Sequence, residues 1–387
     1  SITPLKNTKH FLVSAFMDQR LNGFDIRIIG MFRRDSIQPL HCLFCCAGRL
    51  SEATPTTVFV HSDHFGFPIA TTDIMCRIPE NCDPTHVTLL TQPSAENVTN
   101  PTWIPIKNKK TVGKDEEKMN FTVCISSLFG DYNNVLQFAQ TLEMYRLLGV
   151  NRVVVYNTSC GPELDHLLQD YAQEGFVEII SWPIEKYMNP SHGWLFSRHG
   201  GDINYYAQTT KLNECIYRAM ENSRYVLLHD IDQIIMPYQH SNLVSLMDTL
   251  QQQHPNVGVF RFESHSFSNM RFDPYGKFHL PQWRRVPGVN ILEHIYREEP
   301  NRKEYHPYKM IIQPRMVEQT SVHEVIKNFG EQYIVPPEVS RIIHICSGGT
   351  IPLELLHEDK RLWDFHEKLI PNVDKVLKRV GMMMSKN

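Results

Sequence analysis

From Phe121 onward, apolar runs of strand length alternate with helical patterns, and this alternation restricts the fold more than any other feature of the chain. The run Phe121–Ile125 is followed by a helical apolar pattern that Gly149 ends. A second run, Arg152–Tyr156, is followed by a predicted helix at Pro162–Glu174 with Gly175 directly after it. Repeated strand–helix–strand units predict an α/β domain with a parallel sheet.

The same rhythm continues toward the carboxyl end of the chain. The further predicted elements are a strand at 177–180, a helix at 203–222, a strand at 225–229, a helix at 243–253, a strand at 257–262 and a helical segment at 353–380 that Pro371 interrupts. Ligands of open α/β sheets bind beyond the carboxyl ends of the strands, so we expect the functional residues there.

The first part of the chain has a different pattern. Short alternating segments such as Phe24–Gly30 and Thr57–Val60 are separated by proline and glycine turns, which predicts a small β-sandwich. A length of 387 residues also favours more than one domain. The predicted division is a β-rich accessory domain at 1–106, a charged linker at 107–118, a catalytic domain at 119–350 and a helical segment at 351–387.

Cysteines and glycosylation motifs indicate an oxidising compartment. Five of the nine cysteines lie in the first 82 residues, and their spacing lacks the paired C-x-x-C motifs of structural zinc sites, so we favour disulfides over zinc. Asn97, Asn120 and Asn157 each begin a glycosylation sequon, which favours the secretory pathway. No stretch reaches the roughly 18 apolar residues of a membrane span, and the start at Ser1 suggests that a targeting segment is missing.

Charge and motifs exclude several classes of protein. The 39 basic and 42 acidic residues give a net charge of −3, and no basic block is interleaved with aromatic residues, so nucleic acid is not expected as a partner. Neither G-x-G-x-x-G nor the P-loop motif occurs, which disfavours dinucleotide oxidoreductases and P-loop phosphotransferases. Phosphate binding therefore has to proceed through a metal ion.

Asp230-Ile231-Asp232 follows the strongly apolar strand Tyr225–His229 and suits such a metal. On extended backbone, Asp230 and Asp232 point to the same side and can address one hard cation, whose other ligands come from substrate phosphates and water. The alternative is an ordinary acidic loop after a strand, which is the commoner origin of an isolated tripeptide of this kind.

Several ordered segments resemble glycosyltransferase family 92. They are Phe121–Ile125, Arg152–Asn157, Leu212–Cys215, Asp230–Asp232 and Val322–Val325. The resemblance covers about 121–376 and is greatest to vertebrate, particularly avian, members that add galactose in β1,4 linkage to terminal galactose. It implies a metal-dependent enzyme of the GT-A fold that uses UDP-galactose.

The resemblance also assigns roles around the metal. Asp230 is expected near the ribose and the metal, and Asp232 as a ligand of Mn²⁺, with Mg²⁺ as the alternative ion. A late histidine is expected to complete the site, and His344 is preferred to His323, although a strand-end histidine is as often structural. Many family members have glutamate where this chain has Gln233, so a carboxylate at that position is not essential.

Donor candidates come from strand ends and from lysine charges, and acceptor candidates come from aromatic residues in loops. Uracil and ribose are expected at Ser126, Leu128, Tyr156 and Asn157, and the diphosphate at Lys211 and Lys309, although lysines are usually merely exposed. If Asn157 lines the nucleotide pocket, its sequon should carry no glycan. Trp194, Trp283 and His265 are candidates for stacking on an acceptor sugar, and burial in the core is the alternative for the aromatic residues.

Inversion at the anomeric carbon requires a carboxylate that deprotonates the acceptor hydroxyl. Glu263, just beyond a core strand, is the preferred base, ahead of Glu318 and Asp273. The alternative is a carboxylate that hydrogen-bonds a turn or pairs with Arg261.

Together these features predict an inverting, metal-dependent β-1,4-galactosyltransferase that moves galactose from UDP-galactose to a terminal galactose of a glycoprotein N-glycan. We expect it in the Golgi lumen, as a type II membrane protein whose N-terminal anchor is absent from this sequence. The alternative is a lectin-like protein with an inactive transferase domain. A glycoside hydrolase is less favoured, because its two carboxylates flank the scissile bond, whereas Asp230 and Asp232 share one side.

Overall fold

The computed structural model describes residues 1–110, 118–349 and 351–383. The chain forms two compact units, and each is made of segments that are distant in the sequence. Unit 1 contains 1–118, 181–222 and 319–321, and unit 2 contains 119–180, 223–318 and 322–387. The predicted linker at 107–118 falls largely on residues 111–117, which lie outside the described part of the chain.

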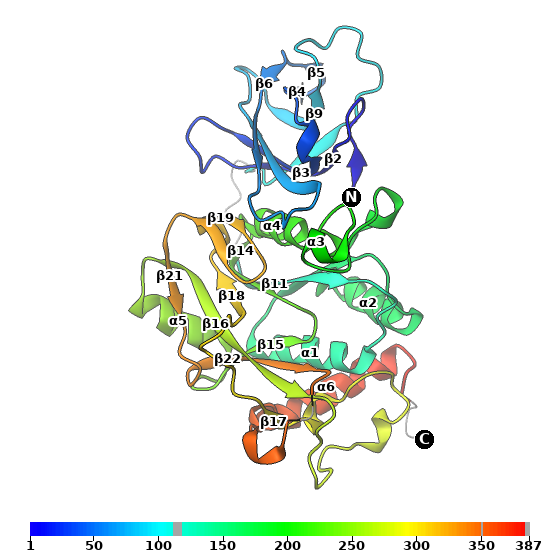
Figure 1. The fold of residues 1–387 in the computed structure, drawn as a ribbon, viewed down its shortest axis with the longest axis vertical. Helices are drawn as coiled ribbons and strands as arrows, with labels where there is room; N and C mark the ends of the chain where they lie inside the picture. Colours follow the sequence, from blue (N-terminus) through cyan, green and yellow to red (C-terminus); the bar gives the residue numbers. More distant parts are fainter. Residues whose placement is uncertain (111–117, 350, 384–387) are drawn as a thin grey trace. The chain divides into compact units, whose positions relative to one another are not determined.

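The N-terminal strands of unit 1 form one continuous hydrogen-bonded sheet (Figure 1). The strand order is β5-β4-β9-β10-β2-β3-β8-β7, and β10 joins the two halves because it pairs with both β9 and β2. The strand pairing therefore does not confirm the two separate sheets of the expected β-sandwich. The strands are β1 (Thr3–Pro4), β2 (Phe11–Met17), β3 (Ile26–Arg33), β4 (His41–Cys46), β5 (Arg49–Leu50), β6 (Thr54–Pro55), β7 (Thr57–Val60), β8 (Ile69–Cys76), β9 (Pro84–Leu90) and β10 (Ile104–Lys107).

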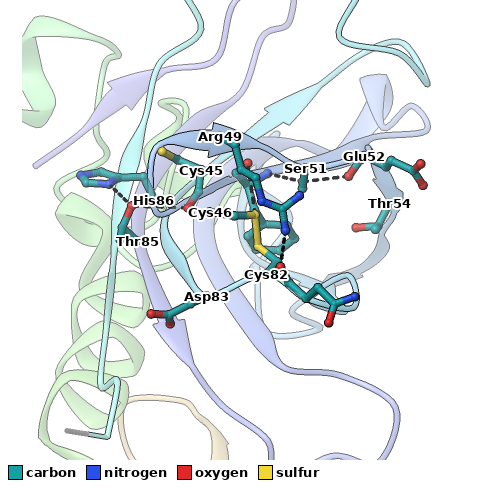
Figure 2. Close-up of a disulfide and its surroundings, with 12 residues drawn as sticks. Cys45, Cys46, Arg49, Ser51, Glu52, Thr54, Cys82, Asp83, Thr85 and His86 are labelled. Atoms are coloured by element: carbon teal, nitrogen blue, oxygen red, sulfur yellow. Dashed lines mark hydrogen bonds between the residues drawn. A yellow bond between two sulfur atoms is a disulfide. The ribbon is translucent and has the colours of Figure 1, made fainter.

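Two disulfides cross-link this sheet, as the cysteine pattern predicts. Cys42 in β4 is bonded to Cys76 in β8, so strands near opposite ends of the strand order lie against each other and the sheet is curled. Cys46, also in β4, is bonded to Cys82 just before β9 (Figure 2). Cys45 between them is a free thiol. Side chains such as Ile28, Phe44 and Val87 fill the inside of the curl.

Unit 1 also takes a segment that the sequence pattern places in the α/β domain. The predicted helix at 203–222 is observed as α4 (Gln208–Ala219), and it packs on β2 and β3; α3 (Phe196–His199) precedes it. The hydroxyl of Tyr217 on α4 donates to Asp73 of β8 at 3.1 Å, and Asp73 also binds Arg27 of β3 at 2.8 Å. This buried polar network explains why the segment folds with the N-terminal strands.

Removal of the Cys46–Cys82 disulfide tests the stability of the curled sheet. The double substitution Cys46→Ser/Cys82→Ser releases a loop with a sequence separation of 36. We expect the free energy of unfolding to fall by about 3–4 kcal/mol, because the unfolded chain regains the entropy of that loop. Chemical denaturation under non-reducing conditions measures it.

The matched control is Cys45→Ser, which removes a half-buried thiol with no disulfide partner. It should change the free energy of unfolding by less than about 1 kcal/mol. Equal losses in the two variants would contradict a cross-linking role for the disulfide.

Unit 2 is a mixed α/β structure, in agreement with the predicted fold class (Figure 1). Its sheet order is β13-β12-β11-β14-β18-β16-β17-β23, in which β11 is parallel to both β12 and β14, and β14 is antiparallel to β18. The strands are β11 (Met119–Leu128), β12 (Arg152–Asn157), β13 (Val177–Ser181), β14 (Ser223–His229), β15 (Gln233–Pro237), β16 (Val257–Ser268), β17 (Tyr296–Arg297), β18 (Tyr308–Ile312), β19 (Val317–Thr320), β20 (Val325–Asn328), β21 (Glu331–Ile334), β22 (Ser340–Cys346) and β23 (His357–Glu358). The last two residues of β19 belong to unit 1.

The helices of unit 2 largely follow the sequence pattern. Gly149 and Gly175 adopt the left-handed conformation that closes a helix, with φ of 100° and 85°. Pro371 lies inside α6, so the predicted interruption is wrong, and α6 packs along α1. The helices are α1 (Val135–Leu148), α2 (Pro162–Glu174), α5 (Leu243–Gln253) and α6 (His366–Arg379).

Candidate active site

The Asp230–Asp232 pair lies in a tight turn between β14 and β15, rather than on extended backbone as the sequence argument assumed. The amide of Gln233 donates to the carbonyl of Asp230 at 3.3 Å and closes the turn. The Gln233 side-chain oxygen accepts from the Asp230 amide at 2.9 Å. Glutamine and glutamate both supply such an acceptor, which explains why the carboxylate can be replaced here. Ile231 is 7% exposed and belongs to the hydrophobic core of unit 2.

A buried histidine and tyrosine hold this turn from behind. The carbonyl of Asp230 lies 2.7 Å from Nδ1 of His229, and Nε2 of His229 lies 2.6 Å from the hydroxyl of Tyr145 on α1. The amide of Ile235 in β15 donates to the same hydroxyl at 2.9 Å. Burial lowers the pKa of His229 to about 4, so the ring is neutral and donates one hydrogen bond while accepting the other. Tyr145 therefore ties together both strands that flank the turn.

Each aspartate of the turn faces a basic group. Asp232 lies 2.9 Å from Nε2 of His344 on β22, and Asp230 lies 3.4 Å from Nζ of Lys309 on β18. Burial disfavours a charge on His344, but its interactions with Asp232 and Cys346 together outweigh burial and raise the pKa of His344 to about 10. The Lys309 side chain is only 3% exposed, whereas that of Asp230 is 34% exposed. The site thus combines accessible carboxylates with a buried ammonium group.

A cavity of about 370 Å³ opens beside this turn and lies wholly within unit 2. Its walls come from the turn, β16, β18, β22 and the loop that follows β17. The lining residues are Asp230, Gln233, Ser264, Ser266, Glu298, Pro300, Asn301, Glu304, Tyr305, His306, Pro307, Lys309, His323 and His344.

Part of the cavity wall is a row of residues across four neighbouring strands. Gln233 of β15 pairs with His344 of β22, and His344 pairs with Ser266 of β16. The carbonyl of Ser266 accepts from the amide of Glu298, which directly follows β17, at 2.9 Å. Residues opposite each other on neighbouring strands project to the same face, and all four line the cavity. The row therefore connects His344, which is paired with Asp232, to the carboxylate of Glu298.

Glu263 and His265, the expected base and an expected acceptor residue, do not line this cavity. Successive side chains of a strand point to opposite faces, and Ser264 and Ser266 of β16 occupy the cavity face. Glu263 binds Arg302 through two hydrogen bonds of 2.9 and 2.6 Å, and its Oε1 lies 2.8 Å from Nε2 of His265. Burial alone would raise the pKa of Glu263, but Arg302 and His265 hold it below its ordinary value. His265 is 2% exposed, so no acceptor sugar can stack on it.

The two late histidines have different surroundings. His344 contacts Asp232, as described above, whereas His323 lines the cavity with its Nδ1 3.4 Å from the carbonyl of Tyr308. Burial lowers the pKa of His323 to about 4, which leaves a neutral ring. His344 is therefore the histidine that the structure brings to the acidic turn.

The expected nucleotide residues lie at the same sheet edge as the acidic turn. β12, β11 and β14 are parallel neighbours, and Leu128 of β11 pairs with Asn157 of β12. The side chains of Ser126, Leu128 and Tyr156 are buried, so contacts from these positions would come from the backbone or after side-chain movement. Asn157 is half-buried, and its Oδ1 has no hydrogen-bond partner among the described residues.

Burial overturns two further expected contacts, Lys211 and Trp283, and the third residue, Trp194, belongs to unit 1. Lys211 lies on α4 in unit 1 and is fully buried, and burial lowers its pKa to about 7, so its ammonium group is not exposed to a diphosphate. Trp283 is 3% exposed, and its Nε1 donates to Asp374 at 2.7 Å. It is therefore buried in the core, which was the alternative to stacking on a sugar. Trp194 lies in unit 1 and stacks on Tyr205 with ring centroids 5.0 Å apart. None of the three lines the cavity.

The donor groups at the acidic turn are of a chemical kind that binds divalent cations. Asp232 and His344 are close enough to bind one ion together, and Asp230 is two residues away. Within the described ranges, no group of three or more His, Cys, Asp or Glu residues is arranged to hold a metal by itself. One or two protein carboxylates, with the remaining ligands from phosphates and water, is the usual arrangement for Mg²⁺ at phosphate sites.

Comparison with known proteins identifies the family to which the chain belongs. The model of glycosyltransferase family 92 matches residues 119–373, and the chain belongs to that family. This range begins with β11 and contains the acidic turn, the whole cavity lining and His344.

Two relatives from Caenorhabditis elegans are similar in sequence. The glycosyltransferase family 92 protein F13G3.3 is 25% identical over 225 residues, which is 58% of this chain and 41% of that protein. The beta-1,4-galactosyltransferase galt-1 is 19% identical over 377 residues, which is 95% of this chain and 78% of that protein. The chain thus spans less than half the length of the first relative and most of the second.

Solved structures are only distantly similar. TarS residues 1–349 from S. aureus, in complex with UDP-GlcNAc, has a TM-score of 0.34 at 13% identity and covers 67% of this chain and 66% of its own. The glucosyl-3-phosphoglycerate synthase of Mycobacterium tuberculosis has a TM-score of 0.26 at 11% identity, and the match covers 51% of this chain and 58% of that protein. The family assignment rests on the sequence match and not on these structures.

Tyr145→Phe tests the support behind the acidic turn. The substitution leaves Nε2 of His229 and the amide of Ile235 without their buried partner, so we expect the free energy of unfolding to fall by about 2–4 kcal/mol. Denaturant titration measures this loss. Tyr225→Phe is the matched control, because its hydroxyl makes one half-buried bond to Gln251 and its loss should cost less than about 1.5 kcal/mol. A neutral Tyr145→Phe substitution would show that the hydroxyl does not support the turn.

Proposed function

We propose that this family 92 glycosyltransferase is an inverting, metal-dependent enzyme that transfers galactose from UDP-galactose in β1,4 linkage to a terminal galactose of a glycoprotein N-glycan. The observation that supports the proposal most directly is the Asp232–His344 pair beside Asp230, Lys309 and a cavity in the same unit. The name of the 19% identical relative galt-1 motivates the choice of galactose and of the linkage. The terminal-galactose acceptor follows from the resemblance to avian members, and the GT-A fold is part of the same proposal.

The residues of the turn would bind the diphosphate end of the donor. Asp232 and His344 would hold a divalent cation, Mn²⁺ or Mg²⁺, with Asp230 beside it, and the bound ion supplies positive charge that stabilises the departing diphosphate. Lys309, buried against Asp230, adds a fixed positive charge on the wall of the same cavity. Tyr145 and His229 keep the aspartates in position, so little reorganisation is needed when the donor binds.

The cavity then provides room for the sugar and the incoming acceptor. Ser264, Ser266 and Asn301 offer hydrogen-bonding groups of the kind that bind sugar hydroxyls. Tyr305, 78% exposed on the loop after β17, offers an aromatic face for a sugar ring. It takes the stacking role that the sequence analysis assigned to Trp194, Trp283 and His265.

Release of UDP from UDP-galactose in the presence of Mn²⁺ and a galactose-terminated glycan tests the proposal. We expect UDP and a product one hexose heavier, and we expect EDTA to abolish both. A lectin-like protein would bind the glycan without releasing UDP above background. Product formation that persists in EDTA would contradict the metal-dependent mechanism.

Asp232→Ala tests the proposed metal ligand. We expect UDP release to fall by at least about a hundredfold, because the variant loses stabilisation of the leaving diphosphate, while the melting temperature stays near that of the wild type. Titration of Mn²⁺ and UDP by calorimetry should show the matching loss of affinity. Asp248→Ala, an exposed aspartate on α5, is the matched charge control and should leave both quantities unchanged. Wild-type turnover in a folded Asp232→Ala variant would remove Asp232 from the site.

We also propose that the enzyme works in the Golgi lumen, as a type II membrane protein in its full-length form. Among the described residues, no helix is long and apolar enough to cross a membrane. Asn97 is exposed at a turn with φ of 63°, whereas Asn120 lies in β11 and Asn157 at the end of β12 is half-buried. Of the three sequons, Asn97 is therefore best placed to carry a glycan.

Glycan mapping tests this assignment. In protein secreted from eukaryotic cells, we expect mass spectrometry after deglycosylation in heavy-oxygen water to label Asn97 and leave Asn157 unlabelled. Asn97→Gln should then remove the glycan-dependent mobility shift, with Asn157→Gln as the matched control. A glycan on Asn157 would contradict its expected place in the nucleotide pocket.

A further inference from the structure

We propose that Glu298, rather than Glu263, is the base that deprotonates the acceptor hydroxyl. This inference rests on the proposed transferase function and assigns a residue that is not among the bases expected from the sequence. Three observations support it. Glu298 lies in the cavity wall, it is separated from the Asp232–His344 pair, and the other candidate carboxylates are less suitably placed or are bound by other groups.

Glu298 has a fixed place in the sheet. It directly follows β17, and its amide donates to the carbonyl of Ser266 at 2.9 Å. Arg297, the residue before it, pairs with Phe267 of β16, so this end of the loop is anchored by strand pairing. The side chain is half-buried and lines the cavity, so its carboxylate is positioned by regular structure and still faces the space beside the acidic turn.

The separation of Glu298 from His344 suits a base on the acceptor side. Within the row, His344 of β22 lies opposite Ser266 of β16, and Ser266 lies opposite Glu298, which directly follows β17. Neighbouring strands lie about 4.8 Å apart, so the His344 and Glu298 ends of this three-residue stretch are roughly 10 Å apart. A donor whose diphosphate binds at Asp232 and His344 would therefore place its sugar between the ends, with Glu298 beyond the sugar. An inverting reaction needs its nucleophile and base on the side of the sugar opposite the leaving group.

The competing carboxylates are less suitable. Glu263 is held in two hydrogen bonds by Arg302, lies beside His265, and is absent from the cavity wall. The Asp273 carboxylate caps a turn by accepting hydrogen bonds from the amides of Tyr275 and Lys277. Glu304 lines the cavity, but it is exposed on the loop after β17.

Glu298, in contrast, combines position with an available carboxylate. Over the described ranges, its side chain makes no hydrogen bond or ion pair. Its oxygens are therefore free to accept a proton from a bound hydroxyl group. A base that is already bound to an arginine would first have to give up those hydrogen bonds.

The proposed step conserves atoms and charge. The acceptor hydroxyl gives its proton to the Glu298 carboxylate, and the oxygen lone pair forms the new bond to the anomeric carbon. The bond between that carbon and the β-phosphate oxygen breaks, and its electron pair leaves with UDP. Glu298 then releases the proton to solvent. The products are the extended glycan, UDP and one proton.

Glu298→Gln tests the assignment, because it keeps the shape of the side chain and removes the base. We expect kcat to fall by about 10²–10⁴-fold, while the affinity for UDP with Mn²⁺, measured by calorimetry, stays within about twofold. Glu298→Asp keeps a carboxylate at a shorter reach and should retain a rate between those of wild type and Glu298→Gln. Circular dichroism and the melting temperature verify that each variant is folded.

The matched control is Glu299→Gln, which makes the same change at the next residue. Glu299 is paired with Arg297 and Arg302 and does not line the cavity, so kcat should stay within about threefold. A Glu298→Gln enzyme that keeps more than a tenth of the wild-type kcat overturns the proposal. An equal loss of UDP affinity and of kcat also overturns it, because Glu298 would then act in donor binding. If the wild-type protein itself releases no UDP from UDP-galactose, the proposed function fails, and that result is separate from either outcome for Glu298.

Discussion

The site depends on one constraint, the rigid turn that joins β14 to β15. Two carboxylates two residues apart repel each other, and a turn that displays both needs support from the core. Tyr145 provides it by binding His229 of β14 and the amide of Ile235 in β15 through one hydroxyl group. Because burial keeps His229 neutral, the support adds no charge next to the aspartates. The turn is thus supported from behind by its backbone and by buried neutral groups, and Asp230 stays on the cavity side.

Strand alternation then decides which polar residues of unit 2 can take part in chemistry. Along β16, Ser264 and Ser266 face the cavity, whereas Glu263 and His265 point away and bind arginines. The two sets alternate along the strand, so they lie on opposite faces of the sheet. The same pairing places His344 and Glu298 in one row, so the register of three strands fixes the spacing between the donor and acceptor ends of the cavity.

Much of the fold could be predicted from the sequence, because local sequence patterns specify where its helices and strands begin and end. Gly149 and Gly175 end their helices through backbone geometry that the chain itself encodes, and the apolar strand before Asp230 predicts the edge at which the site forms. The division into units was not accessible in this way. Helix α4 has an ordinary amphipathic pattern, and only the partners of Tyr217 on β8 and of nearby α4 residues show that it folds with the N-terminal strands.

The errors in the candidate site have the same physical origin. A lysine or tryptophan near a motif in the sequence looks available, but Lys211 and Trp283 are buried by contacts that no local pattern reveals. Lys309 and Lys211 illustrate the difference: both are almost fully buried, yet Nζ of Lys309 lies 3.4 Å from the Asp230 carboxylate, whereas Nζ of Lys211 has no hydrogen-bond partner among the described residues and burial lowers its pKa to about 7. A buried charge persists where an opposite charge has been placed beside it, and in this chain such a pair lies next to the acidic turn.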